Sequence, residues 1–165
     1  VGALSHFVFH SVVKDCLFLV AGVIIYKTGK KTVKELTGIG KEMPITMWCF
    51  TLVSITLVGI PPTSGFISKW YLAEGSWQTG IGGYAWFGPV VLLLSAMLTA
   101  GYLLPISIQS FFPGEGYHYQ ELRKKEPNLL MLIPMLLFTA AAVVFGMFPG
   151  RFLGFLQMTA ADVIR

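Results

Sequence analysis

Four long apolar runs dominate this 165-residue chain and limit what it can fold into. They lie at about 1–26, 44–77, 85–112 and 129–148, and each can cross the core of a bilayer, which takes about 20 helical residues. Only 12% of the residues are charged, roughly half the share that is typical of soluble domains. The sequence therefore predicts an all-α, polytopic transmembrane helix bundle.

We expect residues 1–165 to form a single transmembrane domain with a short C-terminal tail at 149–165. The chain begins at Val1 and runs directly into apolar sequence, without the charged region and cleavage site of a signal peptide. We therefore expect it to be a C-terminal fragment of a longer membrane protein.

Basic residues concentrate in two of the connections between the apolar runs. The connection 27–43 holds five Lys, and 113–127 holds three basic residues, whereas 78–84 holds none. Because Lys and Arg accumulate in cytoplasmic loops, we expect 27–43 and 113–127 to be cytoplasmic, in a bacterial or archaeal cell membrane. We predict that His118, in the second connection, is a solvated loop histidine.

The second apolar run carries a helix-breaking sequence in its middle. Pro61 and Pro62 supply no amide hydrogen, and Gly59 and Gly65 loosen the backbone on either side. We predict a discontinuous helix, broken near 59–65. Unpaired backbone groups are tolerated at membrane depth only where protein or a wet cavity covers them, and such breaks are often places where ions bind.

Three ionisable residues in the first run share one helix face. His6, His10 and Lys14 are four residues apart, so each lies only about 40° around the helix from the one before. Histidine changes charge near neutral pH, and a buried lysine can lose its proton. We predict a proton relay, since ionisable groups at depth are usually functional. The alternatives are an interfacial His6 and a hydrogen-bonded packing role for His10.

Lys69 follows the predicted break, and we assign it to proton transfer, with Ser68 as a neighbouring polar group that tunes it. The alternative is a lysine that anchors a helix end at the interface. Asp15 and Ser11 are further tuning candidates because they lie one turn apart and can face each other; a structural role for Asp15 is equally open. Glu74 does not share a face with Lys69 and is a tuning candidate or an interfacial cap.

Other kinds of site find no support in the sequence. Cys16 and Cys49 lie inside apolar runs and are predicted to be buried free thiols. The sequence has no metal-ligand spacing, phosphate loop, serine triad, haem-binding pair or dinucleotide fingerprint. We predict no metal, no cofactor and no catalytic redox site in this chain, and no nucleic-acid partner.

Two motifs in these segments resemble those of a known family. The first is His6-x-x-x-His10-x-x-x-Lys14-x-x-Leu17-Phe18-x-x-x-Gly22, followed by a basic linker and Met43-Pro44. The second runs from Gly59 to Lys69 and contains the proline pair. In this order, over roughly residues 1–110, they resemble the antiporter-like subunits L, M and N of respiratory complex I (NADH-quinone oxidoreductase). Mrp-type cation/proton antiporters and membrane-bound hydrogenases have the same pattern.

The resemblance implies a larger fold of inverted repeats, of which this chain would hold the end of the second repeat and the last helix. It implies that Lys14 belongs to a central hydrophilic axis with His10 and His6 as relay partners. It also implies that Lys69 is the terminal lysine near the outer exit. Some members have Glu at that position, whereas this chain has Lys, which argues against an M-type subunit. The long lateral helix of the L-type subunit is absent from this sequence, which favours an N-type or antiporter D-type subunit. Asp15 replaces the small residue expected after the lysine.

The leading functional hypothesis is a proton-translocating membrane subunit of a complex I-like or Mrp-like assembly. Its partners would be other membrane subunits, the lipid bilayer and protons, with sodium as an alternative ion. A sodium/proton antiporter subunit and a structural membrane subunit without its own transport path are the two rival hypotheses. Whether the whole assembly is an enzyme is left open.

Overall fold

A computed structural model describes residues 1–78, 83–115, 117 and 124–163, with side chains through residue 160. His118 lies outside the described residues. Within these ranges the chain is helical and has no β-strand, which confirms the predicted all-α class. The elements are α1 Gly2–Thr28, η1 Val33–Leu36, α2 Ile39–Glu42, α3 Pro44–Val58, α4 Ser64–Gln78, α5 Phe87–Phe111, α6 Leu129–Met147 and α7 Gly150–Val163.

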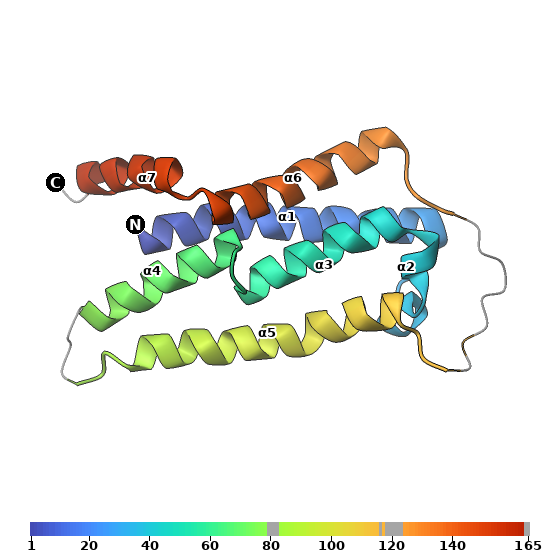
Figure 1. Ribbon diagram of the computed structural model, residues 1–165, viewed down its shortest axis with the longest axis horizontal. Coiled ribbons are helices and arrows are strands. Elements are labelled where there is room, and N and C mark those ends of the chain that lie inside the picture. The colour runs from blue at the N-terminus through green and yellow to red at the C-terminus, as the bar shows by residue number, and fades with distance from the viewer. Residues whose placement is uncertain (79–82, 116, 118–123, 164–165) are drawn as a thin grey trace.

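The long helices run side by side along the longest axis of the molecule (Figure 1). In the described residues, α1, α5 and α6 are long and apolar enough to cross a membrane. Helix α3 has 15 residues and is too short, since it is only about 22 Å long. Figure 1 shows α4 continuing from the far end of α3, so that the two half-helices together run the length of the bundle.

The predicted interruption lies between α3 and α4. Gly59 ends α3 in the left-handed conformation (φ 90°), and its N–H donates to Ile55 O at 3.0 Å. The Pro61–Pro62 peptide bond is cis. The Thr63 hydroxyl donates to Ile60 O at 2.7 Å and closes the turn before α4 begins. The discontinuous helix is therefore confirmed.

The core lies where α1 meets α3 and α6. Its fully buried side chains include Val20, Met47 and Met135. Cys16 is also buried, and its Sγ lies 3.5 Å from Thr139 Oγ1. Both cysteines are buried free thiols, as predicted.

The C-terminal region differs from the prediction. Residues 149–165 were expected to be a short tail, but Gly150–Val163 form α7. The reason is an apolar face at helical spacing: Leu153, Leu156 and Ala160 are all buried. Phe152 packs on Phe9 of α1, with ring centroids 5.3 Å apart. This contact places α7 beside the first turns of α1, as Figure 1 also shows.

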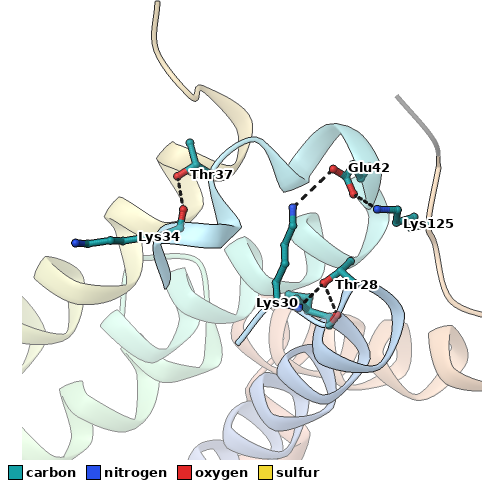
Figure 2. A network of polar contacts seen from close by, with 7 residues as sticks. Thr28, Lys30, Lys34, Thr37, Glu42 and Lys125 are labelled. Atoms are coloured by element: carbon teal, nitrogen blue, oxygen red, sulfur yellow. Dashed lines mark hydrogen bonds and ion pairs between the residues drawn. The ribbon is translucent and has the colours of Figure 1, made fainter. Parts of the chain in front are cut away.

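The connection 27–43 contains η1 and α2 and is held by an ion-pair network (Figure 2). Glu42 lies 3.7 Å from Lys30 Nζ and 3.1 Å from Lys125 Nζ. The Lys125 backbone N–H also donates to Glu42 O at 2.9 Å. The two basic connections therefore lie together at one end of the bundle, as expected for loops on the same side of a membrane. Their cytoplasmic location stays a prediction.

Candidate functional site

The two histidines of α1 lie together at the surface between α1 and α4. Their ring centroids are 5.4 Å apart, with the planes tilted by 36°. Both rings line an open groove of 480 Å³ with Phe7 and Ser11 of α1 and Leu72 of α4. Helix periodicity predicted this neighbourhood correctly, because residues four apart share a face.

His6 connects α1 to the residue that precedes the candidate lysine. Its Nδ1 lies 3.1 Å from the Oγ of Ser68, which is fully buried. The Ser68 hydroxyl donates to Gly65 O at 3.1 Å, so it accepts from His6. This network assigns the hydrogen of a neutral His6 to Nδ1 and leaves Nε2 free to accept a proton.

Lys69 is fixed at the helix break. Its Nζ donates to Leu57 O at 2.9 Å and to Val58 O at 2.8 Å. These carbonyls belong to the last turn of α3, where no helical N–H is available to pair them. The cation therefore caps α3 at the negative end of its macrodipole. Gly59 leaves room for it, since a Cβ there would lie 3.0 Å from Lys69 Cδ.

Two glycines bring backbone segments into close contact around the break. A Cβ on Gly65 would lie 1.8 Å from Thr56 O, so α4 begins against the last turns of α3. A Cβ on Gly146 of α6 would lie 2.3 Å from Pro62 O. Sequence reasoning included Gly65 and missed Gly146, which is one small residue in a long apolar run. Together they cover the break with protein, as a membrane requires.

The N-terminus of α3 has a cap that the sequence did not reveal. Glu126 accepts from the backbone N–H of Ile45 at 2.6 Å and from the Thr46 hydroxyl at 2.8 Å. A carboxylate there complements the positive end of the helix dipole. Helix α3 thus has an anion at its first turn and the Lys69 cation at its last.

The remaining predicted residues are not all brought together. Lys14 is half-buried on α1, but it has no hydrogen bond or ion pair within the described part of the chain. Asp15 is exposed, and the expected contact with Ser11 is not formed, because the Ser11 hydroxyl donates to Phe7 O at 2.8 Å. Glu74 accepts from Gln78 Nε2 at 3.3 Å on the surface of α4, away from the break.

The described residues contain no group of three His, Cys, Asp or Glu side chains that could hold a metal ion. The polar side chains near the break are those of lysine, serine and threonine, and they lie beside backbone carbonyls. Ser64 Oγ is buried there and has no hydrogen-bond partner in the described structure. Such a group is a natural position for a bound water. The arrangement brings an ammonium group, hydroxyl groups and backbone carbonyls together, all of which form hydrogen bonds with water.

Comparison with known proteins shows which family has this sequence and architecture. The family model for the transmembrane region of NADH:quinone oxidoreductase and Mrp antiporters matches residues 1–99. NADH-quinone oxidoreductase subunit N of Desulforudis audaxviator (strain MP104C) is 34% identical over 157 residues, which cover 89% of this chain and 30% of that protein. Na(+)/H(+) antiporter subunit A1 of Staphylococcus aureus (strain Newman) is 28% identical over 156 residues, which cover 90% of this chain and 19% of that protein.

A solved structure has the same fold. The match is to a chain of the membrane-bound sulfane sulfur reductase, an archaeal respiratory membrane complex, with a TM-score of 0.70 and 25% identity. It covers 88% of this chain and 23% of the other. The chain therefore spans less than a third of the length of these relatives. It is an integral membrane protein of the prokaryotic cell membrane, and it belongs to the NADH:quinone oxidoreductase/Mrp antiporter family.

Proposed function

We propose that this chain is part of a proton-translocating membrane subunit in a complex I-like or Mrp-like assembly. Protons would pass between Lys69 and the α1 stripe, which we define as His6, His10 and Lys14. The observation that carries the proposal is the position of Lys69: its ammonium group is held by two carbonyls at a break in a discontinuous transmembrane helix. Helix breaks of this kind often handle ions in membrane transporters.

The contacts between α4 and α1 support a path for the proton. A proton that arrives from Lys14 through His10, whose ring lies beside that of His6, binds the free Nε2 of His6. The Nδ1 proton of His6 then moves to water beside Ser68, whose Oγ is 3.1 Å away, and leaves a neutral ring. Water beside Ser64 and Ser68, whose side chains are buried at the start of α4, carries that proton to a neutral Lys69. Imidazole suits this step because it binds a proton on one nitrogen and releases one from the other.

The test replaces the two lysines in the assembled complex. Lys14→Ala and Lys69→Ala are expected to abolish proton uptake by membrane vesicles energised with the native driving reaction. Lys34→Ala, at an exposed lysine of η1, is the matched control and is expected to pump normally. Undiminished pumping by both lysine variants would refute the relay.

The same vesicles separate the two rival functions. A sodium/proton antiporter subunit would collapse a preset pH gradient on addition of Na⁺, without an electron donor. A structural subunit would tolerate both alanine replacements in transport, whereas the amount of assembled complex would fall. The proposal predicts the opposite pattern, in which assembly is retained and transport is lost.

A further inference from the structure

One face of α1 is exposed along most of the helix and includes a charged residue. We call it the outer α1 face, and it consists of Phe7, Ser11, Asp15, Phe18 and Gly22. These positions are three or four residues apart and so lie on one side of the helix. The rings of Phe7 and Phe18 are 72% and 73% exposed. This face is apolar apart from Ser11 and Asp15.

Asp15 lies at the middle of the membrane span. Helix α1 has 27 residues, of which 13 (2–14) precede Asp15 and 13 (16–28) follow it. Its Cα is therefore about 20 Å from either end of the helix. Among the described residues, the carboxylate has neither a hydrogen bond nor an ion pair, and the neighbouring Lys14 does not reach it. A carboxylate at this depth is costly in lipid and usually pairs with a basic group.

A groove beside Asp15 is suited to another helix. It has a volume of 660 Å³, and besides Asp15 its lining includes Phe18 and Gly22 of α1 with Pro134 and Phe138 of α6. A Cβ added to Gly22 would meet nothing within 4 Å, so the space in front of this glycine is open. Small residues at such positions let transmembrane helices approach closely.

We propose that a transmembrane helix from outside these 165 residues packs on the outer α1 face and places a Lys or Arg side chain against Asp15. Two observations favour this occupant. The unpaired carboxylate at mid-depth is complementary in charge to a Lys or Arg side chain, which lipid tails cannot supply. The curated relative is also much longer, since this chain covers 30% of it, so a protein of this kind has chain beyond the matched part that can supply such a helix. The proposal is independent of the proposed proton path, because it concerns assembly and needs no transport.

The test uses photocrosslinking in the native membrane assembly. A benzophenone amino acid is placed at Phe18, an exposed ring next to the groove, and the crosslinked peptides are identified by mass spectrometry. The control places the same probe at Leu98, which is 67% exposed on α5. Helix α5 packs on α3 and α4, on the other side of the bundle from the groove (Figure 1). We expect the Phe18 probe alone to capture a peptide from an apolar segment that contains a Lys or Arg.

A charge reversal then tests the pairing itself. Asp15→Lys should reduce recovery of the captured helix at least about tenfold, because two buried like charges repel. Replacing the basic residue of that helix with Asp should restore recovery. Crosslinks to lipid alone, to a second copy of this chain, or to a helix without a basic residue would each overturn the proposal. So would a charge reversal that leaves recovery unchanged.

Discussion

The closest backbone contact at the helix break makes Gly65→Ala the sharpest test of the structure. A Cβ on Gly65 would lie 1.8 Å from Thr56 O, and real Cβ atoms essentially never come closer than 3.0 Å to such a neighbour. The start of α4 must therefore move by at least 1.2 Å from the end of α3 (3.0 − 1.8). Lys69 is one helical turn further on, so this movement would also separate its Nζ from the carbonyls of Leu57 and Val58.

The expected cost follows from two opposing effects. Overpacking costs about 1–3 kcal/mol, and the upper end applies because the obstacle is backbone that cannot rotate away. Replacing a helical glycine with alanine returns about 0.5–1 kcal/mol. The net loss is about 2 kcal/mol of unfolding free energy, which lowers Tm by about 4–8 °C where 150–250 residues unfold as one unit and by less where a larger unit unfolds together. Gly75→Ala is the control on the same helix, because a Cβ there meets nothing within 4 Å.

Thermal unfolding of the purified assembly in lipid nanodiscs, followed by tryptophan fluorescence, measures both variants. Trp48 of α3 and Trp70 of α4 lie on either side of the break and report on the affected region. Gly75→Ala should unfold at the wild-type temperature or slightly above it. If Gly65→Ala unfolds at the same temperature as Gly75→Ala, the contact between the two half-helices is wrong as described.

Three further variants test other parts of the bundle. Gly146→Ala should lower Tm by several degrees, since its Cβ would lie 2.3 Å from backbone of the break, whereas Gly101→Ala on α5 has open space and should not. Glu126→Ala should cost about 0.5–2 kcal/mol of unfolding free energy through the lost cap of α3, measured in the same melts. Hydrogen bonds from the backbone N–H groups of Thr32 and Lys31 lower the pKa of the Glu35 carboxyl below its ordinary value of 4.5. The hydrogen bonds that the Glu35 carboxylate accepts therefore stabilise η1 fully above pH 4.5 and are lost as the pH falls through the lowered pKa. Hydrogen exchange of the Thr32 amide should detect this loss of protection. In Glu35→Gln this pH dependence should be absent.

The helices were predictable where composition and local geometry decide them. Apolar runs of membrane length predicted α1, α5 and α6, and the pair Pro61-Pro62 predicted the break, because both depend only on residues close in sequence. Helix α7 was missed because Arg151, Gly154 and Gln157 interrupt its apolar residues, so the segment contains no apolar run of membrane length. Its helical spacing becomes decisive only once α1 is present to cover its apolar face.

The contacts of the candidate site likewise fall into local ones, which the sequence predicts, and non-local ones, which it does not. The neighbourhood of His6 and His10 follows from a spacing of four residues, and the structure bears it out. The contact between His6 and Ser68 joins residues 62 positions apart, and it depends on how α1 packs on α4. The cap formed by Glu126 is equally non-local. Sequence patterns identify residue types suited to a task, but packing between distant segments selects their partners.

The cap formed by Lys69 also bears on how the proposed relay can turn over. An ammonium group has three N–H donors, and two of them bond the carbonyls of Leu57 and Val58. A neutral amine keeps two donors, which is the number that these carbonyls need. Lys69 can therefore release its third proton while α3 stays capped, so transport need not unravel the end of the half-helix. What α3 loses when Lys69 is neutral is the charge at the negative end of the helix dipole, and this contributes about 0.3–1 kcal/mol, or up to about 2 kcal/mol in a partly buried site. The cap therefore adds only a small term to the free energy of deprotonating Lys69, so a group that caps α3 can also serve as the proton carrier of the proposed relay.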